Sequence, residues 1–232
     1  HLSIRRQRQM CIRDRFDIVG PNMIGPSSSH TAGAARLGKS ASKIAGKPVK
    51  EVNFLLHGSF AETYKGHGTD KALVGGILGF DPDDARIKYS FELAKEQGVK
   101  FEFIKTNLGE NVHPNTVKME MILEDGSKST VMGASIGGGN IKLTEMDGLA
   151  LDFNGSRSAV VLEIKDIPGA IAFITGILGH NNKNISMIST NKPAKSEYTF
   201  LTIETEDELE SSLIEQLRKF EVVAKVVVLD KF

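Results

Sequence analysis

The sequence predicts an α/β (α+β) protein in which a mixed-sheet domain precedes a smaller domain. Residues 16–150 alternate short apolar strands, glycine-containing loops and amphipathic helices. Residues 158–232 follow a clear order of strand, helix, strand, strand, helix and strand. With 232 residues, the chain is long enough to build a core in each part.

In the first part, the spacing of apolar residues predicts helices, and short apolar segments bounded by turns predict strands. Apolar residues recur at helical spacing from Ala34 to Ile44, and again from Leu73 to Ile77 after Asp70, which is expected to be the N-cap. The dipeptide Asp125-Gly126 predicts a hairpin, and Gly137–Asn140 predicts a turn. The other expected elements are strands at Val52–Leu56, Lys100–Ile104, Thr116–Leu123 and Ser129–Ser135, and a helix at Phe91–Gln97.

Residues Met146–Ser158 are expected to connect the two domains, with the linker itself at 151–157. The second domain, 158–232, has the ferredoxin-like βαββαβ order. Its expected elements are strands at Ala159–Lys165, Ile185–Thr190, Tyr198–Thr205 and Val222–Leu229, and helices at Ala170–Gly179 and Glu208–Phe220.

The composition excludes several classes of protein. Basic and acidic side chains are balanced at 29 each, which argues against a nucleic-acid binder or a membrane-surface protein. No segment approaches the roughly 20 apolar residues of a membrane span, so we expect a cytoplasmic protein. The single cysteine, Cys11, cannot form an internal disulfide or hold a cysteine-ligated cluster alone.

Residues 1–15 differ from the rest of the chain because they hold five of its nine arginines. They show no convincing periodicity. We expect a basic tail that is non-native or disordered, and we leave it out of the functional argument.

The run Gly25–Thr31 is the most informative stretch. It places the hydroxyls of Ser28, Ser29 and Thr31, together with the imidazole of His30, directly before a predicted helix. The first turn of a helix has unpaired backbone N–H groups and a partial positive charge, so it attracts an anion such as a carboxylate. We therefore expect a small-molecule site. The alternative is that one serine caps the helix and the others are ordinary loop residues.

Three further polar clusters contain histidine, and their similarity points to one shared site. In one of them, glycines on both sides leave the imidazole of His67 unobstructed, and histidine is the usual proton carrier near neutral pH. Asp70 could cap its helix, orient His67, or do both. The spacings match no metal-ligand pattern, so we expect no metal on these histidines. The clusters are His57-Gly58-Ser59, Gly66-His67-Gly68-Thr69-Asp70 and His113-Pro114-Asn115-Thr116.

These motifs carry a resemblance to a known family. The chain resembles the beta subunits of the two-subunit bacterial iron–sulfur L-serine dehydratases, also called L-serine deaminases. The resemblance covers 16–232. It rests on FDIVGPNMIGPSSSHTAGAARLG from Phe16, the HGS turn at His57, KGHGTDKA from Lys65 and HPNT from His113.

The resemblance implies an enzyme that converts L-serine to pyruvate and ammonia with a [4Fe-4S] cluster. It implies that the cysteine ligands of the cluster lie on a separate alpha subunit, with which this chain forms a heterodimer. Under this reading His67 is the general base, and Thr69 and Asp70 hold its loop. Ser28, Ser29, His30 and Thr31 bind the substrate, Asn115 is a further candidate for a substrate hydrogen bond, and His57 has no assigned role.

The second domain resembles an ACT domain, a regulatory module that commonly binds amino acids between copies. The features behind this resemblance are the βαββαβ order, Asp166-x-Pro168-Gly169 at the first turn and Asn184-Ile185 before the second strand. We expect L-serine or another small effector at Asp166, Pro168, Gly169, Asn184 and Ile185. A homodimer through this domain or the first is expected. The alternative is a unit that only dimerises.

A different function is open to the same sequence. The first domain also resembles the allosteric substrate-binding domain of some phosphoglycerate dehydrogenases, which would make the chain a serine- or anion-sensing module without catalytic residues. The paired SSSHT and GHGTD motifs favour the enzyme, because a sensor would not need them. An assembly subunit without a ligand would leave every polar cluster unexplained.

Overall fold

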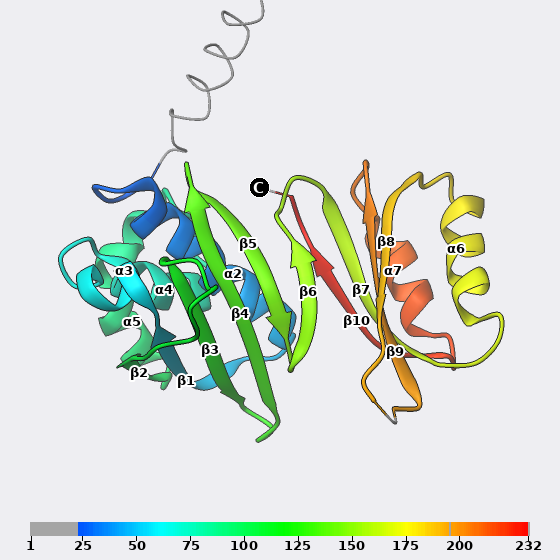
Figure 1. Ribbon diagram of the computed structural model, residues 1–232, viewed down its shortest axis with the longest axis horizontal. Coiled ribbons are helices and arrows are strands. Elements are labelled where there is room, and N and C mark those ends of the chain that lie inside the picture. Colours follow the sequence, from blue (N-terminus) through cyan, green and yellow to red (C-terminus); the bar gives the residue numbers. More distant parts are fainter. Residues whose placement is uncertain (1–22, 195, 232) are drawn as a thin grey trace, which may run out of the picture.

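Two β-sheets lie beside each other in the computed structural model, which describes residues 23–194 and 196–231 (Figure 1). The expected basic tail, 1–15, lies outside the described residues, as do residues 16–22 at the start of the motif that begins at Phe16. Within the described part of the chain, no helix is long and apolar enough to cross a membrane.

The first sheet is mixed, as predicted. β1 (Val49–Leu56) pairs in parallel with β2 (Lys100–Lys105) and antiparallel with β3 (Thr116–Leu123). The remaining neighbours are antiparallel, so the strand order is β2-β1-β3-β4-β5-β6. The other three strands are β4 (Lys128–Gly137), β5 (Asn140–Met146) and β6 (Leu149–Phe153).

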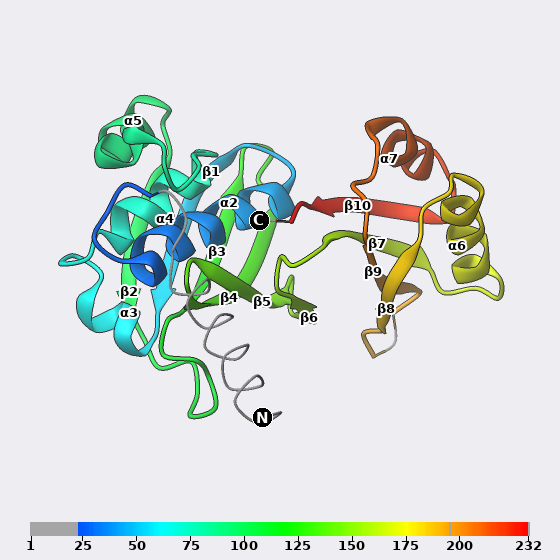
Figure 2. The same cartoon turned by 90° about the horizontal axis from the view of Figure 1, so that it is seen from above.

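Helices cover one face of this sheet (Figure 2). Helix α2 (Ala34–Ala45) buries Leu37 and Ile44 and ends at Gly46, whose φ of 69° suits only glycine well. It packs against α4 (Thr69–Ile77), and α5 (Ser90–Glu96) packs beside α4. The short helices α3 (Gly58–Thr63) and η2 (Ala85–Tyr89) were not predicted.

The expectation that Asp70 caps its helix is wrong. The N-cap of α4 is Gly68, in the left-handed region at φ 71°, and no side chain caps this end. Asp70 lies inside the first turn and accepts a hydrogen bond from the neighbouring Lys71 N at 2.8 Å. Its acidic side chain still suits the positive end of the helix dipole.

The expectation that Met146–Ser158 is only a connector is also wrong. Strand β6 occupies Leu149–Phe153 and forms the edge of the first sheet, with Leu151 and Phe153 buried. The turn before it is Asp147-Gly148, with φ of 50° and 81°. Positive φ at both central residues is the geometry of a two-residue hairpin, so Asp-Gly was a usable signal for this strand.

The second sheet has the predicted ferredoxin-like arrangement. Its order is β10-β7-β9-β8, so the first strand of the unit lies between the fourth and the third. Helix α6 begins after Gly169, and α7 is shorter than the expected Glu208–Phe220. The elements are β7 (Ser158–Lys165), α6 (Ala170–His180), β8 (Ile185–Asn191), β9 (Tyr198–Thr205), α7 (Ser211–Arg218) and β10 (Val223–Leu229).

The two sheets share part of one core. One face of the second sheet packs on α6 and α7, whereas Val161, Val227 and Leu229 join the core of the first sheet. Polar contacts reinforce this junction. Lys225 Nζ lies 3.2 Å from Asp147 Oδ2, and Asn191 Nδ2 donates to the carbonyl of Ala150 at 3.2 Å.

The contact between α2 and α4 generates a stability prediction. A Cβ atom on Gly76 would lie 2.2 Å from the Ala35 carbonyl oxygen, so Gly76→Ala forces the two backbones apart. We expect it to lower the free energy of unfolding by about 1–3 kcal/mol in urea titrations.

Gly176→Ala in α6 is the matched control. A Cβ there meets nothing within 4 Å, so the better helix propensity of alanine should raise stability by about 0.5–1 kcal/mol. Equal stability of the two variants would contradict the close α2–α4 contact.

Candidate functional site

The serine-rich run forms the π-helical turn η1 (Ser28–Gly33), which continues into α2. Ser27 is its N-cap, and Ser27 Oγ accepts a hydrogen bond from His30 N at 3.2 Å. At the other end, Gly33 lies against β4, where a Cβ atom would come within 2.1 Å of Ser135 Oγ. Single π-turns are rare and occur frequently at functional sites.

The ring of His30 is held by hydroxyls at both nitrogens. Nδ1 lies 3.1 Å from Ser29 Oγ, and Nε2 lies 3.2 Å from Ser59 Oγ. The ring of Phe60 packs against it edge-on, with centroids 5.3 Å apart. The two hydroxyls and the aromatic wall therefore give His30 a defined orientation.

His67 lies beside His30, as the shared-site hypothesis expected. The two imidazole centroids are 5.0 Å apart and the rings are tilted by 46°. His67 N donates to Thr63 O at 3.2 Å, and the His67 carbonyl accepts from Thr31 Oγ1 at 3.3 Å. The backbone of this turn is thus fixed, while the His67 side chain is exposed.

The environment of His30 favours its neutral form. Burial, first, and the neighbouring His67, second, lower the pKa of His30. Burial penalises any charged imidazole, and two adjacent imidazolium ions repel each other. A neutral His30 therefore lies against an exposed imidazole near neutral pH.

Thr69 and Asp70 follow His67 but point to different roles. Thr69 is fully buried, and its Oγ1 has no hydrogen-bond partner within the described part of the chain. Burial is the main influence on Asp70 and raises the pKa of its carboxyl group. Two other hydrogen bonds hold the His67 turn. Thr31 Oγ1 donates to the His67 carbonyl, and Thr69 N donates to Tyr64 O at 3.0 Å.

Asn115 directly precedes β3, close to the HGS turn. Its backbone N donates to His113 Nδ1 at 3.1 Å, and its Oδ1 is buried without a partner among the described residues. The preceding Pro114 carbonyl accepts from Phe60 N at 3.4 Å. Asn115 is therefore linked to His30 through the contacts of Pro114 with Phe60 and of Phe60 with the His30 ring.

Ser59 and Phe60 are site residues that the sequence reasoning missed. The sequence shows the HGS turn as a motif. It does not show that the Ser59 hydroxyl, which follows a strand, contacts the imidazole of His30. The contact joins residues 29 positions apart, and only the packing of α3 against η1 produces it.

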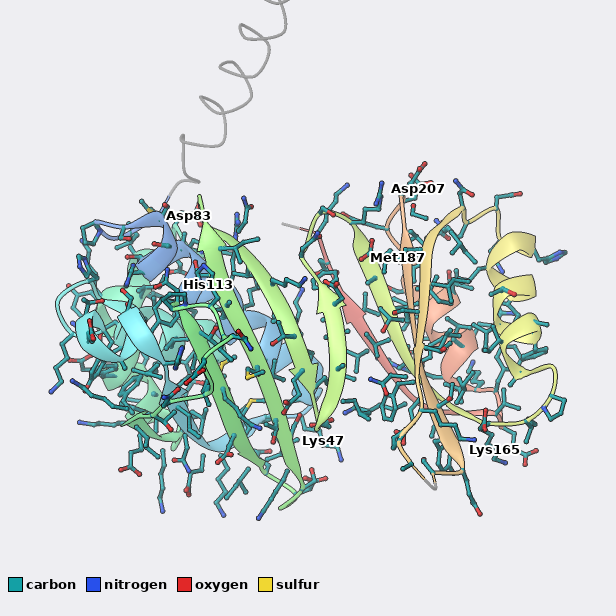
Figure 3. The ribbon with its side chains drawn as sticks, viewed as in Figure 1. Lys47, Asp83, His113, Lys165, Met187 and Asp207 are labelled. Atoms are coloured by element: carbon teal, nitrogen blue, oxygen red, sulfur yellow. The ribbon has the colours of Figure 1, made fainter. Side chains whose placement is uncertain are left out.

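The expected effector residues do not meet within one chain. Ile185 pairs with Thr205, which pairs with Ser158 at the start of β7, whereas Asp166 follows the end of β7. The length of β7 separates the two ends by roughly 23 Å. Figure 3 shows the same separation, with Lys165 at one end of the second sheet and Asp207 at the other.

The expected effector residues are accessible to a second copy of the chain. Asp166, Pro168, Gly169 and Asn184 are all exposed, and Asp166 pairs with Lys192. His113, also labelled in Figure 3, lies with the first sheet and far from this surface. Any effector contact that uses both ends would need another copy.

Residues 23–194 and 196–231 contain no group of three or more His, Cys, Asp or Glu side chains placed to hold a metal ion.

Comparison with known proteins identifies relatives over most of the chain. The family model described as "Serine dehydratase beta chain" matches residues 14–146. An L-serine dehydratase beta chain from Peptoniphilus asaccharolyticus is 47% identical over 198 residues, which cover 85% of this chain and 89% of the relative. A probable L-serine dehydratase beta chain from Bacillus subtilis is 39% identical over 217 residues, 94% of this chain and 98% of the relative.

A more distant relative is a D-3-phosphoglycerate dehydrogenase from Bacillus subtilis. It is 24% identical over 198 residues, which cover 85% of this chain but 37% of that protein. The family model matches more than half of the chain, and the two beta chains align over nearly all of it. The chain therefore belongs to the serine dehydratase beta chain family.

Proposed function

We propose that this chain is the beta subunit of an L-serine dehydratase and converts L-serine to pyruvate and ammonia together with an alpha subunit. The observation that carries the proposal is the pair of imidazoles 5.0 Å apart, one held by hydroxyls and one exposed. The two related beta chains support the substrate and the subunit arrangement.

Dehydration of serine requires removal of the Cα proton and departure of the β-hydroxyl. The product aminoacrylate tautomerises to an imine, which water hydrolyses to pyruvate and ammonia. In the proposal, the exposed imidazole of His67 takes the Cα proton. Neutral His30 beside it limits repulsion when His67 becomes positively charged.

The hydroxyl groups divide into two sets. Ser28 and Ser29, in η1, are partly exposed and are proposed to bind the substrate carboxylate and amine. Thr31 is buried and donates to the His67 carbonyl, so its proposed role is to hold the turn that carries the base. Buried acceptors at Asn115 Oδ1 and Thr69 Oγ1 are further candidates for the substrate amine.

The proposed cofactor is a [4Fe-4S] cluster held by the alpha subunit. Cysteine thiolates are the usual ligands of such clusters, and this chain has a single cysteine, Cys11. This chain does not fit as the ligand donor, but its exposed His67 and partly exposed Ser29 fit a surface that faces a partner. When bound, the cluster would supply a Lewis acid for the leaving hydroxyl.

The sensor alternative is not favoured. The phosphoglycerate dehydrogenase relative is 24% identical, against 47% and 39% for the two beta chains. A sensor would also not need the exposed imidazole of His67 beside the neutral imidazole of His30.

The proposal is tested by anaerobic pyruvate formation from L-serine after iron–sulfide reconstitution. We expect activity from this chain mixed with a cysteine-bearing alpha subunit and none from either alone. In that mixture, His67→Ala should lower turnover by about two to four orders of magnitude, because a general base contributes roughly that much.

The matched control is His180→Ala at the exposed end of α6, which should leave turnover unchanged. Near-normal turnover of His67→Ala would remove His67 as the base. An inactive mixture that demonstrably associates would favour the sensor.

The paired imidazoles generate a titration prediction for the full chain. His67→Gln removes the nearby positive charge, so the pKa of His30, measured by NMR, should rise. It should remain below its ordinary value, because burial is the larger cause and persists. The same titration in His180→Gln should match the wild type. An unchanged pKa of His30 in His67→Gln would show that the two rings do not interact.

The βαββαβ unit is proposed to bind L-serine or another small effector between two copies. Calorimetry on the full chain should show heat on addition of L-serine. Asn184→Ala should abolish this heat, whereas His67→Ala should retain it, because Asn184 directly precedes β8 of the second sheet and His67 lies in the turn before α4. Heat that is lost only in His67→Ala would assign serine binding to the first site and leave dimerisation for this unit.

A further inference from the structure

The HGS turn after β1 contacts three separate parts of the site. His57, Gly58 and Ser59 are consecutive, yet each contacts a different part of the site. His57 contacts the start of the segment 106–115, Gly58 contacts its end, and Ser59 contacts η1. The segment 106–115 connects β2 to β3 and has no regular secondary structure.

His57 anchors the start of this segment through one ring nitrogen. Leu108 N donates to His57 Nδ1 at 3.2 Å, and the nearby Thr106 N donates to Leu56 O at 2.9 Å. A backbone N–H can only donate, so Nδ1 must be unprotonated and a neutral His57 carries its proton on Nε2. The imidazole thus acts as a specific acceptor.

Gly58 receives the end of the segment. Its φ is +52°, and a Cβ atom there would lie 2.8 Å from the Pro114 carbonyl oxygen and 2.9 Å from Pro114 Cα. The same carbonyl accepts from Phe60 N. The backbone of Pro114 is therefore seated directly on the turn, and Asn115 follows it.

Ser59 fixes the other side of the site. Its Oγ lies 3.2 Å from His30 Nε2, while its carbonyl accepts from Thr63 Oγ1 at 2.7 Å. Because Ser29 Oγ meets His30 Nδ1, the Ser59 contact is what completes the clamp on the His30 ring.

We propose that His57 and Ser59 are positioning residues: His57 holds the segment that presents Asn115, and Ser59 holds His30 against His67. This rests on the proposed dehydratase function. Neither residue touches the reacting atoms in this assignment. Their effects should therefore separate into substrate binding for His57 and turnover for Ser59.

The proposed role of His57 is tested by replacing it with asparagine and with glutamine, whose side chains end in an amide. Asparagine carries its oxygen on Cγ, as histidine carries Nδ1, whereas the glutamine oxygen lies one carbon further out. His57→Asn should keep the Leu108 amide protected from hydrogen exchange and keep KM for L-serine within about threefold. His57→Gln should lose this protection and raise KM about tenfold with a smaller change in kcat.

The Ser59 half uses Ser59→Ala and Ser59→Thr. Loss of the hydroxyl should lower kcat about tenfold at nearly constant KM and change the ¹⁵N shift of His30 Nε2. Threonine retains the hydroxyl, so Ser59→Thr should restore most of kcat and most of the wild-type ¹⁵N shift of His30 Nε2. Urea unfolding of all four variants checks that they fold alike. His180→Asn and Ser212→Ala, exposed in the second sheet's helices, are the matched controls.

Three results would overturn the proposal. The first is a proton on His57 Nδ1 in the wild-type ¹⁵N spectrum. The second is indistinguishable Leu108 protection and KM in His57→Asn and His57→Gln, and the third is an unchanged kcat and His30 spectrum in Ser59→Ala. An inactive wild-type mixture would instead count against the dehydratase itself, and the NMR readouts would still decide the two anchoring contacts.

Discussion

The close packing of α2 on α4 is the constraint on which the candidate site depends. Gly38 and Gly76 let the two backbones approach so closely that an added Cβ would lie 2.4 Å from Leu73 O or 2.2 Å from Ala35 O. Helix α2 directly follows η1, and α4 directly follows the turn that carries His67. The helix contact fixes α2 on α4. The hydrogen bond from Thr31 Oγ1 to the His67 carbonyl and the 5.0 Å contact between the rings of His30 and His67 join the segments that precede the two helices.

The sheet supplies the remaining part of the site. β1 ends at the HGS turn, and His57 N donates to Thr116 O at the start of β3, so the pairing of these strands places Pro114 and Asn115 beside Phe60. Near η1, Asn115 Oδ1, Thr69 Oγ1 and Ser135 Oγ are buried without hydrogen-bond partners in the described residues, an arrangement that costs stability.

Several elements of the fold and the site could be predicted from the sequence because their causes are local. The periodicity of Leu37 and Ile44 determines a helix, and the hydroxyl run before it marks its start. The prediction failed where a local signal allowed two structures. Asp70 is a good N-cap residue, but Gly68 reaches the left-handed conformation that the turn after His67 requires. Asp147-Gly148 was interpreted as part of a connector, and the strand after it was missed. That strand buries Leu151 and Phe153 only because strands far away in the sequence pack around it.

The sequence by itself determined the helices and strands with strong periodicity, the βαββαβ order and the residue types able to handle a proton and an anion. Each of these follows from side chains close together in the chain. Only the tertiary structure decided that His30 is clamped by Ser59, that Thr31 holds the His67 turn and that Asp166 and Ile185 lie at opposite ends of a sheet. Such contacts depend on how helices and strands pack, because residues distant in sequence meet only when a shared core fixes their separation.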